Sequence, residues 1–221
     1  MWYKLKRILI YPDGVTEKQV YPAWWKPWAN TIAYYPLKED VLDYSWNWNN
    51  WSWNPNSFTG WVANYSWNST TLPYSIIYRD AYTVSVWVVS EVTSWFKSVM
   101  GQHSNSYYWF NILFIKNNNV NYITGNSGYE FTRYYDSNLN WWKLLTCTSD
   151  WSTTKLYINW ELKATWTYWW KRSDTLYMWY DHWYNGWAFT WKISELIVED
   201  KVRTAQKIQD YYNQTKSNYW L

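Results

Sequence analysis

Tryptophan occupies positions where a β-rich chain normally places glycine, and no other feature constrains its folding more. Residues 45–54 read SWNWNNWSWN, with four tryptophans among Asn and Ser. Trp160, in YINWEL, stands between two alternating runs, where the strongest hairpin signal would be Asn-Gly. Trp151, in SDWS, replaces the glycine of an expected Asp-Gly turn. A bulky residue at positive φ is a genuine outlier, so this many are not ordinary turn residues.

The glycine count points the same way, because 221 residues contain 25 Trp and only 6 Gly. We therefore predict that most of the tryptophans stand for glycine, as in a genome that reads UGA as Gly, translated with a table that reads it as Trp. The exceptions are Trp87, which lies inside a clear strand, and Trp142, which precedes one, while Trp187 fits either residue. The alternative is a true aromatic-rich surface that stacks on sugar rings. UGG codons at Trp46 and Trp160 would refute the prediction.

Charge and cysteine content exclude several classes of protein. The net charge of +3, without a long run of one sign, makes no case for nucleic-acid binding. The single cysteine, Cys147, excludes an internal disulfide framework and is expected in a strand core. No apolar run reaches the roughly 18 residues of a membrane span, and the run near the N-terminus is too short for a signal-peptide core.

The chain divides into two parts. Residues 1–30 predict a hairpin, turning at Pro12–Gly14, and a linker; residues 31–221 predict one domain. In that domain strand signals recur every 8 to 15 residues, which is typical of a two-sheet antiparallel β-sandwich or jelly roll. The predicted strands are 32–37, 71–78, 82–90, 97–102, 108–116, 120–124, 129–133, 143–148, 155–158, 162–167, 175–178 and 192–199.

One convincing helix lies near the C-terminus. Thr204 is a good N-cap for the segment AQKIQDYYNQTK that follows it. Ile208, Tyr211 and Tyr212 have the i, i+3, i+4 spacing that packs a helix against a sheet. The tail 217–221, SNYWL, is expected to fray.

With Trp read as Gly, residues 34–53 become YYPLKEDVLDYSGNGNNGSG. This resembles the opening of laminin-G-like (concanavalin A-like lectin/glucanase) jelly-roll domains, whose first strand precedes a D-x-S-G-N-G-N-x-G loop. Later segments resemble the family in the correct order over roughly residues 31–212. They are YTVSVWV (82–88), WKLLTCTSDWS (142–152), LYINWEL (156–162), FTWKISELIV (189–198) and 203–211. The resemblance implies a two-sheet sandwich that binds sugars or other surface ligands.

The sequence also departs from that family. Ser194 stands where Asp is frequent, and Gln206 and Lys207 stand where Glu is common. Residues 1–30 lie outside the module.

Catalytic and zinc patterns are weak in this sequence. Related glucanases carry E-x-D-x-x-E on one strand, and retaining hydrolysis needs two carboxyl groups about 5–5.5 Å apart. The nearest acidic cluster, Glu195 with Glu199 and Asp200, lacks that spacing and is expected at an exposed strand edge. His103 and His182 are isolated, without the spacing of a zinc site. We therefore expect no enzyme.

Two weak candidate sites remain. The fold implied by the resemblance often carries calcium, which prefers hard oxygen ligands. Asp43, Asn47 and Asn49 could supply them, although Asp and Asn also simply build tight turns. Aromatic rings beside Asn and Asp suit sugar binding, while exposed tyrosine is the alternative interpretation. The candidate ligand-binding residues are Tyr107, Tyr108, Tyr180, His182 and Tyr184.

These observations predict a non-catalytic module that binds glycans or a cell surface, on a phage virion, tail or cell-envelope protein. Residues 1–30 would dock it to a larger assembly. The alternative is a structural virion or surface module for decoration or oligomerisation without sugar binding; a glycoside hydrolase is less favoured. Virion, extracellular or cell-surface localisation is expected.

Overall fold

A computed structural model of the chain confirms the predicted all-β class. The elements that it describes are antiparallel strands with one short α-helix near the C-terminus. No helix among these residues is long and apolar enough to cross a membrane. The description covers residues 7–11, 14–18, 30–37, 42–45, 57–58, 63–64, 70–71, 81–89, 96–103, 110–116, 119–122, 132–136, 141–150, 152–167, 175–178 and 192–219.

The larger of two stacked sheets has eight strands. Its order is β14-β13-β12-β7-β16-β5-β4, and β3 pairs with β16 beside β5. The bounds are β3 Thr31–Tyr35, β4 Ser57–Phe58, β5 Ala63–Asn64, β7 Tyr82–Val89, β12 Lys143–Ser149, β13 Thr153–Ile158, β14 Glu161–Thr167 and β16 Lys192–Glu199.

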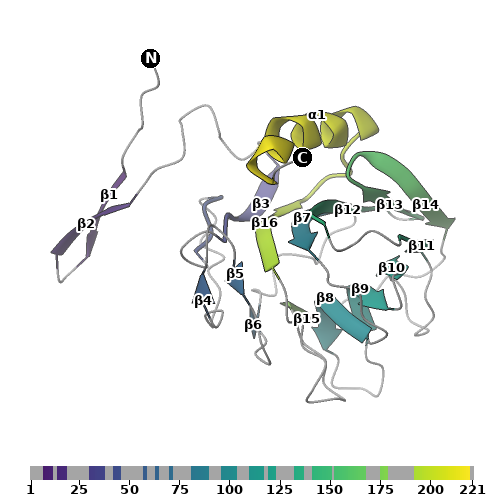
Figure 1. Cartoon of the computed structure of the whole chain (residues 1–221), viewed down its shortest axis with the longest axis horizontal. Coiled ribbons are helices and arrows are strands. Elements are labelled where there is room, and N and C mark those ends of the chain that lie inside the picture. The colour runs from purple at the N-terminus through teal and green to yellow at the C-terminus, as the bar shows by residue number, and fades with distance from the viewer. Residues whose placement is uncertain are drawn as a thin grey trace.

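The smaller sheet has six strands in the order β11-β10-β9-β8-β15-β6. Figure 1 shows the eight-stranded sheet between this sheet and helix α1 (Ala205–Thr215). The predicted strands that correspond to β7, β12 and β16, and to β8 and β9, are confirmed, whereas nearly all of the predicted strand 71–78 lies outside the described residues. Strands β4 and β5, of two residues each, are too short for a period of two to show. The bounds are β6 Thr70–Thr71, β8 Phe96–His103, β9 Phe110–Lys116, β10 Asn119–Tyr122, β11 Thr132–Tyr135 and β15 Thr175–Met178.

Strand β7 shows why both faces of the larger sheet are apolar. Alternation puts Val84 and Val86 on one face, with Cys147 opposite Val84 on β12. It puts Trp87 on the other face, opposite Leu144. All five side chains are at most 2% exposed. The first face contributes to the core of the sandwich, and the second packs under the helix.

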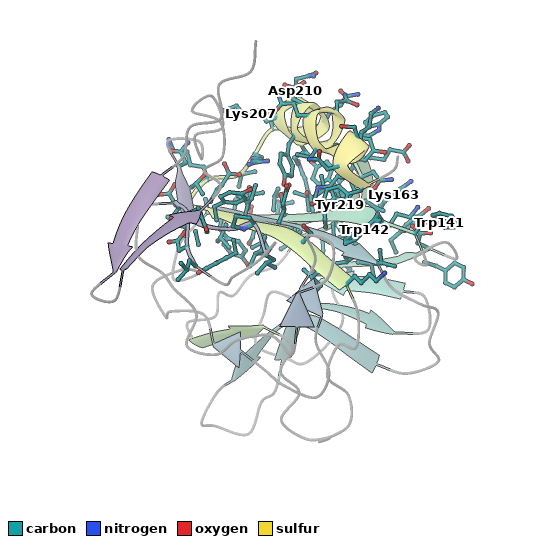
Figure 2. All side chains as sticks on the ribbon, turned by 60° about the vertical axis from the view of Figure 1, so that its left-hand side comes forward. Trp141, Trp142, Lys163, Lys207, Asp210 and Tyr219 are labelled. Carbon is teal, nitrogen blue, oxygen red and sulfur yellow. The ribbon has the colours of Figure 1, made fainter. Side chains whose placement is uncertain are left out.

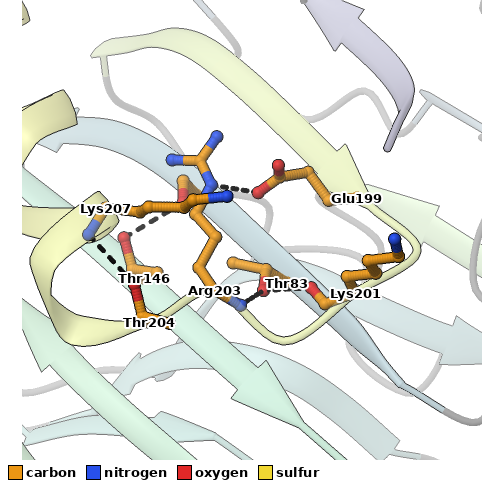
Figure 3. Close-up of polar contacts among 8 residues, drawn as sticks. Thr83, Thr146, Glu199, Lys201, Arg203, Thr204 and Lys207 are labelled. Carbon is orange, nitrogen blue, oxygen red and sulfur yellow. Dashed lines mark hydrogen bonds and ion pairs between the residues drawn. The ribbon is translucent and has the colours of Figure 1, made fainter. Parts of the chain in front are cut away.

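Helix α1 begins where the sequence predicts. The Thr204 hydroxyl accepts a hydrogen bond from the Lys207 amide, as an N-cap does. Just before it, the Thr83 hydroxyl on β7 lies 2.6 Å from the Lys201 carbonyl and accepts a bond from the Arg203 amide (Figure 3). Ile208 and Tyr211 are buried, so the predicted apolar face is confirmed.

The expectation that the tail frays is wrong up to Tyr219. A 3-10 helix, η2 (Lys216–Tyr219), continues α1, and Tyr219 is only 5% exposed. Its ring stacks on Trp87 with the centroids 4.2 Å apart, and its hydroxyl bonds the Ser194 hydroxyl at 3.0 Å. Trp87 in turn donates from Nε1 to the Thr215 hydroxyl. The tail is held as far as Tyr219 because its side chains contact Trp87 on β7 and Ser194 on β16.

Strand β16 carries a bulge where Ser194 and Leu196 flank Glu195. Glu195 has a φ of 47°, a region unusual for a residue other than glycine. Its amide donates to the Pro36 carbonyl, and its carboxylate accepts a hydrogen bond of 2.9 Å from the Tyr211 hydroxyl. The bulge thus aims a carboxylate at the helix, and the hydrogen bond compensates for its burial.

The N-terminal strands β1 (Arg7–Tyr11) and β2 (Gly14–Lys18) form a two-stranded sheet of their own. They pair antiparallel from Arg7–Lys18 to Tyr11–Gly14, as the predicted hairpin requires. Figure 1 shows them standing apart from the sandwich. The division into residues 1–30 and 31–221 stays a prediction.

Candidate functional site

Asp43 follows β3 and fixes the start of the loop after it. Its Oδ1 accepts hydrogen bonds from the amides of Tyr34 and Ser45, at 2.9 and 2.8 Å. Its Oδ2 lies 2.8 Å from the Ser45 hydroxyl. This is the turn-building role that short acidic side chains favour. Asn47 and Asn49 lie outside the described residues, and the described part holds no group of three His, Cys, Asp or Glu that could bind a metal.

The tyrosine and histidine candidates lie beyond the structural description. Tyr107, Tyr108, Tyr180, His182 and Tyr184 are all in segments between described strands. Their role in ligand binding therefore stays a prediction.

The acidic cluster on β16 does not lie at an exposed strand edge, so that expectation is wrong. Strand β16 pairs on both sides, and Glu195 and Glu199 are 3% and 4% exposed. Glu199 pairs with Arg203 (Figure 3), and Glu195 pairs with Tyr211. The two carboxylates therefore have separate partners beneath the helix segment.

Burial controls the protonation of this ion pair. Desolvation raises the pKa of Glu199, although the charge and hydrogen bond of Arg203 oppose the shift. Desolvation also lowers the pKa of Arg203 to about 10, with Glu199 acting against it. Both directions show that burial disfavours the charged forms more than the pairing favours them. The pair has the features of a structural contact between the end of β16 and the segment that leads into α1.

A different group of polar side chains gathers where the edge strands of the two sheets meet. Strand β11 of the smaller sheet lies against β13 and β14 of the larger one. Here the Lys163 ammonium lies 5.1 Å from the centre of the Tyr134 ring and 2.5 Å from the Glu161 carboxylate. Asp136, two residues after Tyr134, forms a second ion pair with Lys143, and 3.9 Å separates the Asp136 Oδ2 from the Lys143 Nζ. We name these five residues the edge cluster.

The two ion pairs of the edge cluster act on each other. A hydrogen bond from Lys163 lowers the pKa of Glu161, and the charges of Lys163 and Lys143 add to the effect. The hydrogen bond to Glu161 likewise raises the pKa of Lys163, against the effect of its partial burial. The side chains of Asp136 and Lys143 are only 15% and 16% exposed. The cluster therefore places paired ammonium and carboxylate groups where the edge strands of the two sheets meet.

Exposed aromatic rings border the edge cluster along the chain. Tyr135 is 59% exposed, Trp141 is 63% exposed and Trp160, in the β13–β14 turn, is 41% exposed. Figure 2 shows Trp141 and Lys163 on the same side of the molecule, away from Asp210 on α1. Trp141 and Trp160 are among the tryptophans predicted to stand for glycine, so Tyr135 is the ring of these three that does not depend on recoding. A ring of this kind beside polar groups suits hydroxyl-rich ligands.

The edge cluster was missed in the sequence because its members come from three separate segments. The available signals were Tyr-Tyr-Asp at the end of a strand and the Glu-x-Lys that opens the next hairpin arm. Neither signal is specific. Only the approach of β11 to β14, two strands of different sheets, brings them together.

Comparisons with known proteins support the fold. No protein-family model matches the sequence, and no curated protein sequence matches it either. Among solved structures, domain 4 of AbnA, a GH43 extracellular arabinanase from Geobacillus stearothermophilus, in complex with arabinotriose, has a TM-score of 0.60 at 16% identity. The match covers 82% of this chain and 97% of that domain.

Toxin binding domains have the same fold over about half of their length. The binding domain of botulinum neurotoxin DC, in complex with SialylT, has a TM-score of 0.62 at 15% identity, covering 84% of this chain and 51% of that one. The binding domain of Paraclostridial Mosquitocidal Protein 1 has a TM-score of 0.62 at 12% identity, covering 84% and 52%. At these identities the likeness shows a shared β-sandwich fold.

Proposed function

We propose that the chain is a non-catalytic module that binds glycans or a cell surface. The observation that carries this proposal is the β-sandwich, shared with domains whose structures hold arabinotriose or SialylT. The edge cluster supports it, because paired charged groups beside the exposed ring of Tyr135 suit sugar hydroxyls and sugar faces. The setting we favour is a phage virion or tail, or a cell envelope, outside the cell.

A glycan array with the whole chain tests this function. Specific binding to a restricted set of sugars is the expected result. Release of reducing sugar from a polysaccharide would contradict the non-catalytic assignment, and the separate burial of Glu195 and Glu199 argues against it.

The second candidate is a structural module for decoration or oligomerisation, and the N-terminal hairpin favours it. An isolated two-stranded sheet is marginally stable in water, so β1 and β2 would gain stability from a partner. These two strands pair with each other over five residues and with no other described strand. Residues 1–30 would therefore dock the module to a larger assembly. Stable self-assembly without sugar binding would favour this candidate.

We keep calcium as a proposal for the loop that begins at Asp43. Carboxylate oxygens are hard ligands of the kind that calcium prefers, and the carboxylate of Asp43 lies at the start of this loop. Asn47 and Asn49 would have to complete the ligand set. Titration calorimetry with Ca²⁺ tests the site, and an absence of heat at millimolar Ca²⁺ would leave Asp43 with its turn-building role alone.

We also infer that the tryptophans of this chain have two origins. Trp87 is fully buried and hydrogen-bonded, and Trp142 packs against Tyr219, as expected of genuine tryptophan. Trp160 has an exposed indole in a two-residue turn, as expected for a recoded glycine. The positive φ of that turn belongs to Asn159, at 62°, rather than to Trp160. Codon sequences test the inference: UGA at Trp160 with UGG at Trp87 is the expected result.

Recoding also predicts a positive φ or an exposed indole in a turn at Trp46, Trp48 and Trp151. They lie outside the described residues. Their reading as glycine stays a proposal that the same codons decide.

A further inference from the structure

We infer, resting on the proposed function, that the edge cluster and Tyr135 form the sugar-binding site, and that its ligand is a neutral oligosaccharide. The site differs from the tyrosine and histidine set predicted from the sequence. The argument uses Tyr135 and the edge cluster, none of which is a tryptophan, so it holds however UGA is read.

The charges of the edge cluster define the class of ligand. It contains two ammonium groups and two carboxylates, arranged as the pairs Lys143–Asp136 and Lys163–Glu161. An ammonium donates only and a carboxylate accepts only, so each pair matches two neighbouring hydroxyl groups, one accepting and one donating. An acidic sugar would meet both carboxylates as well as both ammonium groups. A neutral sugar with adjacent hydroxyls therefore fits best.

The position of Tyr135 sets the minimum size of the ligand. Tyr134 pairs with the fully buried Val120 and lies under Lys163, so it faces the space between the sheets. Tyr135, the next residue on β11, faces the opposite side and is 59% exposed. One sugar ring cannot contact both sides of a strand. A ligand that hydrogen-bonds the edge cluster and stacks on Tyr135 needs at least two rings and crosses the edge strand.

Calorimetry of the whole chain with defined sugars tests this inference. The neutral probes are arabinotriose, maltotriose and chitotriose with their monosaccharides, and sialyllactose is the acidic probe. Binding of at least one neutral trisaccharide, more tightly than sialyllactose, is the expected result. Tyr135→Ala should weaken the binding of that trisaccharide about tenfold and leave the binding of its monosaccharide unchanged. Lys163→Met and Glu161→Gln should each weaken the binding of the trisaccharide and of the monosaccharide about tenfold.

Matched controls separate this inference from the proposed function. Lys192→Met removes an exposed lysine at the start of β16 and should leave binding unchanged. Circular dichroism must show that each variant is folded. If trisaccharide binding survives in Tyr135→Ala and Lys163→Met but is lost in Tyr108→Ala or Tyr180→Ala, the edge site is wrong and the glycan-binding function stands. Tighter binding of sialyllactose overturns the neutral ligand class. If no sugar binds on the array or in calorimetry, both proposals are wrong.

Discussion

Trp87 and Trp160 are the same residue type in opposite environments. Trp87 is fully buried on β7, stacks on Tyr219 and donates a hydrogen bond to Thr215. Trp160 has 41% of its surface exposed in a turn. Burial and partners, rather than residue identity, decide what each side chain contributes.

This contrast predicts opposite responses to glycine. Trp87→Gly removes a packed indole and adds backbone freedom to a central strand, so we expect a loss of about 4 kcal/mol or more in the free energy of unfolding. Trp160→Gly removes an exposed ring from a turn, so we expect a change within about 1 kcal/mol. Urea unfolding measures both. Similar losses at the two positions would contradict the two origins inferred for these tryptophans.

The Glu199–Arg203 pair is a second feature at the residue scale. Both side chains are nearly inaccessible, and burial raises the pKa of Glu199 and lowers that of Arg203. Glu199→Gln leaves the guanidinium without its carboxylate, so we expect a loss of about 3–5 kcal/mol. The double variant Glu199→Leu, Arg203→Met should lose much less. A double-mutant cycle by urea unfolding measures the coupling, and additive losses would show that the pair is not coupled.

At the scale of elements, the C-terminal segment contributes to the packing of the larger sheet. Helix α1 and η2 cover the face of β7 and β12 that bears Trp87 and Leu144. The sequence predicted the helix from its N-cap and apolar spacing. It did not predict η2, because the partners of Tyr219, Trp87 and Ser194, are distant in sequence.

Tyr219 provides a test of that packing. Tyr219→Ala removes a ring stacked on Trp87, so we expect a loss of about 3 kcal/mol in the free energy of unfolding. Tyr219→Phe keeps the ring and loses the bond to Ser194, at a cost of about 1 kcal/mol. Asn218→Ala, at an exposed neighbour, is the control. An unchanged midpoint of thermal unfolding in Tyr219→Ala would contradict the docking of the tail.

The sequence was most informative where its signal is local. The long strands follow from alternation, as in residues 82–89, and the β13–β14 turn from Asn159 followed by a glycine-like position. The prediction that Glu195 and Glu199 lie at an exposed strand edge was wrong. Strand order is a nonlocal property, and it places β16 inside the larger sheet. The edge cluster was missed for the same reason, since it depends on contact between two sheets.

At the scale of the whole molecule, the described strands of the hairpin and those of the sandwich share no sheet. We expect that deleting residues 1–30 leaves the thermal unfolding midpoint of the sandwich within about 2 °C, because β1 pairs with β2 alone. Differential scanning calorimetry measures it. A fall of 10 °C or more would show that the predicted boundary at residue 30 is wrong.

The contact between β11 and β14 also affects whether copies of the protein can polymerise by adding strands to a sheet. An open edge strand is a template on which another chain can pair and extend a sheet. On this side of the sandwich, the two edge strands lie against each other, and charged residues occupy β14. Polymerisation along this edge is therefore disfavoured. Assembly through residues 1–30, as proposed above, would therefore leave the edge with Tyr135 open to solvent.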